Sequence, residues 1–183
     1  TDDIRRIVDE FSKFARMPEL RRKNEDLSAL VESAVSLQQV GQPNVSINLS
    51  QPKLPIVTSI DATLINQALT NILKNAGESI ETRMQDTSTS KHDGVIEVLL
   101  KNEPDIVVLN ISDNGVGLPQ DRSRLFEPYV TTRDKGTGLG LAIVKKIIEE
   151  HGGVLKLEDS APFENTGIIG ALISIELPKS KNL

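Results

Sequence analysis

The chain has 183 residues, of which 38% are hydrophobic and only 3% aromatic, so it can bury one core of Leu, Ile and Val. A formal net charge of -5 without a long basic run disfavours nucleic-acid binding. The absence of cysteine excludes disulfides and thiolate metal sites. No apolar run approaches the roughly 18 residues of a membrane helix, so we expect a soluble piece without direct membrane contact.

The first half of the chain begins with an amphipathic helix, predicted over residues 2–16 because apolar residues recur there at helical spacing. Its apolar face packs either on a partner helix or second copy, or on its own domain. A charged stretch, 19–26, separates it from a second helical pattern over 27–37. We therefore divide the chain into residues 1–20 and 21–183.

Strand and helix patterns then alternate. Alternating apolar residues over 45–49 predict a half-buried strand, and a short second strand is expected around 56–57. The helical period returns over 61–82, where Asp61 is a suitable N-cap. The polar tract 83–93 has no period and is interpreted as a mobile surface loop.

In the second half, strands over 95–100 and 106–111 are joined by a turn-rich tetrad, which predicts a hairpin. A helix over 139–150 and strands over 154–157 and 168–177 follow the irregular stretch 119–136. Strands next to strands, with helices grouped between them, favour a two-layer α+β sandwich over a parallel βαβ sheet.

Two glycine-rich loops, 113–118 and 136–141, stand at the end of a strand pattern and at the start of a helix pattern. Backbone amides in such places can bind an anion, although ordinary turns also use glycine. On the 61–82 helix, Asn71 and Asn75 lie in a polar face that could be simply solvated. Composition alone favours the solvated face, but asparagine is a poor helix former, which leaves a role as oxygen donor open, with Asn75 the better candidate ligand of phosphate-bound Mg²⁺.

These segments occur in the order of four motifs of one family. Residues 71–76 resemble an N box, 113–117 a first glycine box, 125–129 an F box and 136–141 a second glycine box. The chain is thus similar to bacterial sensor histidine kinases over about 24–178, and the run 126–153 is most similar to nitrogen-regulation sensors of the NtrY/NtrB type.

The resemblance implies a Bergerat-type (GHKL/HATPase) ATP-binding domain: an α+β two-layer sandwich with a mixed sheet, three helices and a lid over 119–135. It implies ATP and Mg²⁺ as cofactors, with Asn71, Lys74 and Asn75 as catalytic residues and Asn75 as the metal ligand. Asp113 would accept a hydrogen bond from the adenine amino group. The nucleotide contacts that the resemblance transfers are Asp113, Gly115, Gly117, Leu118, Phe126, Thr131, Thr132, Arg133, Lys135, Gly136, Thr137, Gly138, Leu139, Gly140 and Leu141.

Asn71 bears on the type of reaction. Gyrase, mismatch-repair and chaperone ATPases resemble this pattern but carry a glutamate at that position, where it activates water. An amide is no efficient general base, so the sequence favours a protein histidine kinase over a hydrolase. The alternatives are a Bergerat-fold ATPase and a non-catalytic nucleotide-binding regulatory module.

The acceptor histidine of the family is not recognisable here. His92 lies in a polar loop and His151 at a helix end, where it would carry a favourable charge when protonated. Residues 1–17 resemble the second helix of the dimerisation hairpin, so we expect a fragment whose acceptor helix lies upstream. The implied partners are this hairpin, a second protomer and a response regulator, with the chain a cytoplasmic domain of an inner-membrane sensor. Gly170 and its two successors replace threonines that the family often places near the pocket.

Overall fold

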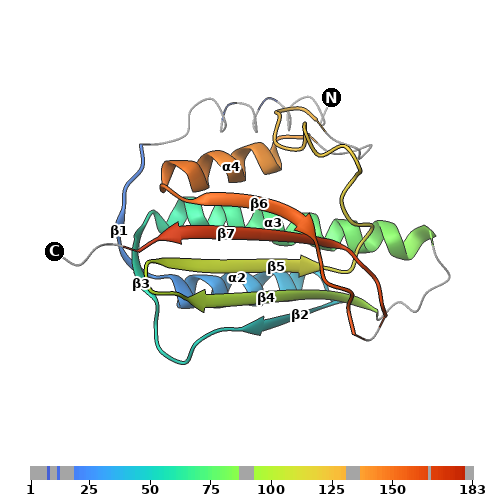
Figure 1. Cartoon of the computed structure of the whole chain (residues 1–183), viewed down its shortest axis with the longest axis horizontal. Coiled ribbons are helices and arrows are strands. Elements are labelled where there is room, and N and C mark those ends of the chain that lie inside the picture. The colour runs from blue at the N-terminus through green and yellow to red at the C-terminus, as the bar shows by residue number, and fades with distance from the viewer. Residues whose placement is uncertain are drawn as a thin grey trace.

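The protein forms two layers, a sheet and a set of helices packed against one face of it (Figure 1). This computed structural model describes Val8, Ser12 and residues 19–86, 93–130, 137–164 and 166–179. Apart from Val8 and Ser12, the helix predicted over 2–16 lies outside the described residues.

The main sheet has five strands in the order β2-β4-β5-β7-β6. Strand β2 pairs parallel with β4, and the other neighbours pair antiparallel. The predicted hairpin and the mostly antiparallel, mixed sheet are therefore confirmed. The strand bounds are Val45–Ser50 for β2, Gly94–Asn102 for β4, Ile106–Asp113 for β5, Val154–Asp159 for β6 and Ala171–Pro178 for β7.

The helices α2 (Leu27–Gly41), α3 (Ala62–Asp86) and α4 (Gly140–Glu150) form the second layer. Alternate residues of β4 and β5 are buried, as expected for strands covered on one face. The long helix α3 contacts α2, α4, β4 and β5, so it is the centre of the core. This arrangement confirms the predicted α+β two-layer sandwich.

Both α2 and α3 begin at an aspartate cap. Asp26 Oδ1 accepts hydrogen bonds from the backbone N–H groups of Ser28 and Ala29 at 2.9 and 3.2 Å. Asp61 Oδ1 accepts from Thr63 and Leu64 at 3.1 and 3.2 Å, which confirms the predicted N-cap. Each cap satisfies two N–H groups that a helix start leaves without a partner.

The predicted loop 83–93 is wrong at its start, because α3 continues through Asp86. The side chain of Arg83 is buried at 8% exposure, and its Nη2 donates to the carbonyl of Asp93 at 3.3 Å. The methylene stem of an arginine can cover apolar surface while its charged end finds an acceptor, and the polar composition of the tract concealed this packing.

A short strand was also missed. Strand β1 (Lys23–Asp26) pairs antiparallel with β3 (Val57–Ile60) in a separate two-stranded sheet. The sequence of β1 is wholly polar, so it has no apolar alternation to reveal it. Pairing through the backbone needs no such pattern.

Candidate nucleotide-binding site

The candidate site is built around α3, whose Asn75 lies beside the second glycine loop. Asn71 and Asn75 are half-buried and one helical turn apart, so they share a face of the helix. An atom placed at the Cβ position of Gly140 would lie 3.6 Å from Asn75 Nδ2, an ordinary van der Waals contact. The structure therefore brings Asn75 to the first residue of α4.

Lys74 lies on another side of α3. Its Nζ is 3.9 Å from Glu78 Oε1, in an exposed pair one turn apart. Lys74 and Glu78 also line a hollow between α2 and α3, together with Gln38 and Gln42. The role of Lys74 in catalysis stays a prediction. In the structure its side chain lies on the side of α3 that faces α2.

The start of α4 is suited to an anion. Its N-cap position is occupied by Leu139, which is fully buried and supplies no side-chain hydrogen bond to the first turn. The N-cap side chain therefore does not serve as an acceptor for this turn, and the helix dipole places partial positive charge there. Thr137, Gly140 and Leu141 around this turn are half-buried.

Gly138 fixes the shape of the second loop. Its φ of 69° lies in the left-handed region, and a Cβ atom there would be 2.6 Å from the carbonyl carbon of Tyr129. Tyr129 itself has a φ of 67°, which is uncommon for a residue with a side chain, and its N–H donates to Gly138 O at 3.1 Å. Two left-handed residues in backbone contact therefore hold residues 129 and 138 together.

The first glycine loop begins at the end of β5. Asp113 is buried, and its Oδ1 accepts a hydrogen bond from the N–H of Gly115 at 2.8 Å. The next N–H, that of Val116, donates to Ser79 Oγ on α3 at 3.1 Å. A Cβ atom on Gly115 would lie 2.2 Å from Ser79 Oγ and 2.7 Å from the Ser79 backbone, so only glycine allows this loop to lie so close to the helix.

Asn114 closes the loop from behind. Its side chain is fully buried, with Oδ1 accepting from Val95 N–H at 2.9 Å and Nδ2 donating to Asp93 O at 2.6 Å. Both bonds reach the start of β4. The buried amide therefore satisfies its own polar atoms and fixes the position from which Asp113 projects.

Gly170 lies directly against the backbone of Asp113. A Cβ atom at this position would be 1.9 Å from Asp113 O and 3.1 Å from Asn114 Cα. Gly117, with a φ of 77°, runs past the same segment, because its Cβ position is 3.5 Å from Ile169 O. The glycine where threonine was expected is thus explained by a backbone contact behind the candidate base site.

The segment 119–130 is irregular, as predicted, and contacts α4 through an aromatic ring. Lys145 Nζ lies 5.2 Å from the centroid of the half-buried Phe126 ring, within the range of a cation–π interaction. Leu118, which precedes the segment, is also half-buried. Of the predicted nucleotide contacts, Thr131, Thr132, Arg133, Lys135 and Gly136 lie outside the described residues.

The family follows from comparison with known proteins. A family model described as "Histidine kinase-, DNA gyrase B-, and HSP90-like ATPase" matches residues 60–181, which include α3 and both glycine loops. The chain belongs to this ATPase family.

Individual relatives indicate which kind of protein in this ATPase family the chain resembles. Nitrogen regulation protein NtrY of Azorhizobium caulinodans is 47% identical over 180 residues, which are 98% of this chain and 23% of that protein. The mycobacterial sensor histidine kinase MprB matches in structure with a TM-score of 0.71 and 25% identity, over 88% of this chain and all of that one. Full-length ShkA in complex with AMPPNP shares the fold, with a TM-score of 0.76, 24% identity and coverage of 99% of this chain and 37% of that one.

The chain is therefore an ATP-binding domain of the type found in sensor histidine kinases. It spans about a quarter of the length of the curated relatives that it matches. Within the described ranges, none of the helices has the length and apolar character needed to cross a membrane.

Of the two histidines, the structure describes His151, which does not have the setting of a phosphoryl acceptor. His92 lies outside the described residues. His151 is 2% exposed at the end of α4, where Nε2 accepts from Asp61 N–H at 3.0 Å and Nδ1 is 2.7 Å from Ile147 O. Nδ1–H therefore donates to the carbonyl, and the ring is the neutral tautomer.

His151 is neutral in this hydrogen-bonding arrangement, whereas the sequence suggested a favourable charge at the end of the helix. Burial lowers its pKa, and the nearby Arg22 acts in the same direction, while the carbonyl of Ile147 and the carboxylates of Asp61 and Glu150 oppose them. Asp61 has a lowered pKa although burial opposes this, because it accepts backbone hydrogen bonds from Arg21, Leu64 and Thr63. The hydrogen bond between Asp61 N–H and His151 Nε2 joins the start of α3 to the end of α4.

Proposed function

We propose that the domain binds Mg-ATP between its two glycine loops and transfers the γ-phosphoryl group to a histidine on a dimerisation hairpin, for onward transfer to a response regulator. The observation that carries the proposal is the meeting of Asn75 with Gly140 at the start of α4. The side-chain amide of Asn75 lies beside a helix start whose N-cap side chain makes no hydrogen bond, and both features suit a metal-bound phosphate chain.

Asp113 is proposed to select the base. A carboxylate has about four acceptor positions, so the bond from Gly115 leaves capacity for the adenine amino group. Guanine presents a carbonyl oxygen at that place, and a buried carboxylate facing it would be repelled rather than paired. Gly115, Gly117 and Leu118 would line the base, with Gly138, Gly140 and Leu141 nearer the phosphates.

The donors at the site fit Mg²⁺. Among the described residues, no three His, Cys, Asp or Glu side chains come together to hold a metal. The proposed protein ligand is the amide oxygen of Asn75, and phosphate oxygens and waters would complete the shell, as Mg²⁺ prefers. The ion would neutralise charge on the phosphates.

Asn71 supports transfer rather than hydrolysis. It is half-buried on the same face as Asn75, and its amide cannot take a proton from water. In the proposed reaction a histidine nitrogen forms a bond to the γ-phosphorus, the bond from that phosphorus to the bridging oxygen breaks, ADP leaves and the imidazole releases a proton. The domain contributes position and charge neutralisation.

The proposal includes the rest of the parent protein and the segment that would cover the nucleotide. Residues 1–20 would belong to the dimerisation hairpin, so that the acceptor histidine and a second protomer come with the rest of the parent protein. The domain would lie on the cytoplasmic side of an inner-membrane sensor. Thr131, Thr132, Arg133, Lys135 and Gly136 would close over the nucleotide, with Phe126 and Thr137 on either side of them.

The test combines three measurements on the chain. ATP binding is measured by titration with and without Mg²⁺, phosphate release is followed without an acceptor, and phosphoryl transfer is followed to a supplied hairpin from a nitrogen-regulation kinase. We expect binding that Mg²⁺ strengthens, transfer to the hairpin and little acceptor-free release. Binding without transfer would favour a regulatory nucleotide-binding module, and rapid acceptor-free release would favour an ATPase.

A further inference from the structure

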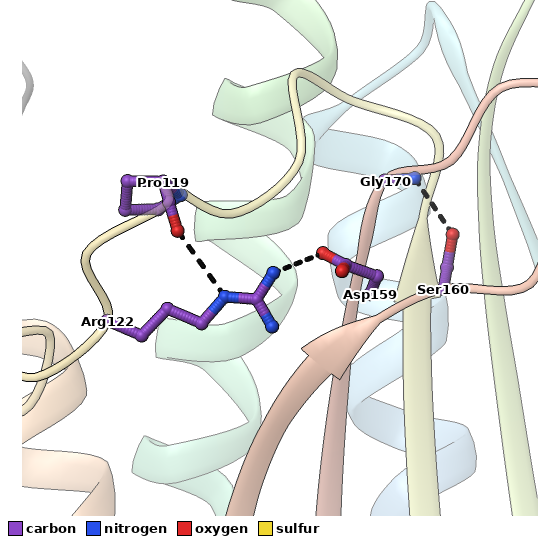
Figure 2. A network of polar contacts seen from close by, with 5 residues as sticks. All are labelled: Pro119, Arg122, Asp159, Ser160 and Gly170. Carbon is purple, nitrogen blue, oxygen red and sulfur yellow. Dashed lines mark hydrogen bonds and ion pairs between the residues drawn. The ribbon is translucent and has the colours of Figure 1, made fainter.

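Arg122 connects the segment that follows the first glycine loop to the end of β6 (Figure 2). Its Nη2 lies 2.6 Å from Asp159 Oδ1, and its Nε donates to the carbonyl of Pro119 at 3.3 Å. One planar guanidinium thus holds both the backbone of its own segment and a carboxylate of the sheet. The two residues it joins are 37 positions apart in the sequence.

The carboxylate belongs to a strand end that supports the candidate base site. Asp159 is the last residue of β6 and is paired with Ala171 in β7. The next residue, the buried Ser160, exchanges two hydrogen bonds with Gly170: its N–H donates to Gly170 O at 3.0 Å, and its Oγ accepts from Gly170 N–H at 2.8 Å. Figure 2 shows the second of these bonds beside the ion pair.

Gly170 transmits this support to Asp113. The two backbones are so close that a Cβ atom on Gly170 would overlap Asp113 O. The first glycine loop passes the same place, with the Cβ position of Gly117 lying 3.8 Å from Gly170. Three segments therefore pack one against the next: the end of β6, residues 169–170 and the first glycine loop. Arg122 lies after that loop in the sequence, and its ion pair with Asp159 connects it to the end of β6.

We propose that Arg122 is a positioning residue for the adenine site: its bonds to Asp159 and Pro119 hold the first glycine loop and the following segment against the Ser160–Gly170 corner behind Asp113. The proposal rests on the proposed ATP binding and deepens it. The side chains of Arg122 and Asp159 are 38% and 55% exposed, and exposed pairs add little to folding stability. Their effect is therefore expected on nucleotide affinity and not on unfolding.

A second ion pair in the same segment provides the control. Arg124 Nε lies 2.9 Å from Glu127 Oε2, and both side chains are more than half exposed. This pair links residues three positions apart and reaches no strand. Arg124→Gln therefore removes the same charge as Arg122→Gln without cutting a connection to the sheet.

The experiment measures the Kd for ATP and for ADP, and the Tm without nucleotide, in the whole chain. Arg122→Gln and Asp159→Asn are each expected to weaken both nucleotides by the same factor, roughly two- to fivefold, at unchanged Tm. Equal factors are expected because the site concerned holds the base, which ATP and ADP share. The exchange Arg122→Asp with Asp159→Arg restores the ion pair but not the bond to Pro119, so it should recover part of the lost affinity, and Arg124→Gln should bind like the wild type.

Three results would overturn the inference: wild-type affinity in Arg122→Gln, an equal loss in Arg124→Gln, or no recovery in the exchanged pair. The second would reduce the effect to general charge attraction, which falls with added salt. A wild-type chain that binds no ATP would instead overturn the proposed function. The two failures are therefore distinguishable in one set of titrations.

Discussion

Gly170→Ala tests the support behind Asp113. The new Cβ atom would lie 1.9 Å from Asp113 O and 2.8 Å from Asp113 C, both backbone atoms at the end of a central strand. Carbon atoms in contact are normally separated by about 3.5 to 4.0 Å, so the strand end has to move. Because no flexible side chain can yield here, the substitution displaces the aspartate itself.

The size of the effect follows from the kind of overlap. Extra atoms forced into a packed core typically cost about 1 to 3 kcal/mol in the free energy of unfolding. For a chain of this length, that corresponds to a Tm lowered by roughly 2 to 12 °C. A displaced Asp113 would also lose its hydrogen bond to adenine, which lowers ATP affinity by about tenfold or more.

The assay is thermal unfolding together with ATP titration. Gly41→Ala is the matched control, because nothing lies within 4 Å of a Cβ atom at that position. We expect the control to unfold and bind like the wild type. If Gly170→Ala matches the wild type in both Tm and ATP affinity, the contact between Gly170 and Asp113 has no part in holding the base site.

Two further predictions concern α3 and its start. Ser79→Ala removes the acceptor of the Val116 N–H bond, so we expect a loss of about 0.5 to 1.5 kcal/mol in unfolding free energy and weaker ATP binding; unaltered affinity in titration would separate the loop from the site. Because the pKa of His151 is lowered, the folded chain binds fewer protons than the unfolded chain near the ordinary value of 6.5. Its contribution to stability is therefore present above that value and is lost as the pH falls through the folded pKa. Urea unfolding should show this pH-dependent part in the wild type and its disappearance in His151→Gln, and an unchanged profile in the variant would refute the assignment.

The order of helices and strands could be predicted because it rests on local patterns. The apolar spacing of α3 and the aspartate before it sufficed to place the helix and its cap. Strand β1 could not be found in this way, because its four residues are polar and its pairing with β3 is made by the backbone. The end of α3 was missed because burial of Arg83 depends on what packs against it.

The motifs of the candidate site could be recognised in the sequence, whereas the contacts that support them could not. Asp113 and the glycines stand in recognisable local order, and a family model confirmed the type of domain. The supporting contacts join residues that are distant in the sequence, so local spacing cannot predict them; they are made by Ser79, Asn114, Gly170 and Arg122. Glycine at 170 was noticed as a departure, and its reason became clear only from the contact with Asp113.

In the proposed function, Asn75 helps to hold Mg-ATP beside the start of α4 for phosphoryl transfer. The most direct test of this role is the rate of transfer to a supplied hairpin by Asn75→Ala, measured over a range of Mg²⁺ concentrations. The control is Thr63→Ala, an exposed position on the same helix. We expect Asn75→Ala to stay folded but to lose transfer and the Mg²⁺ dependence of ATP binding, while Thr63→Ala keeps both. Transfer by Asn75→Ala at the wild-type rate and with wild-type Mg²⁺ dependence would contradict this role.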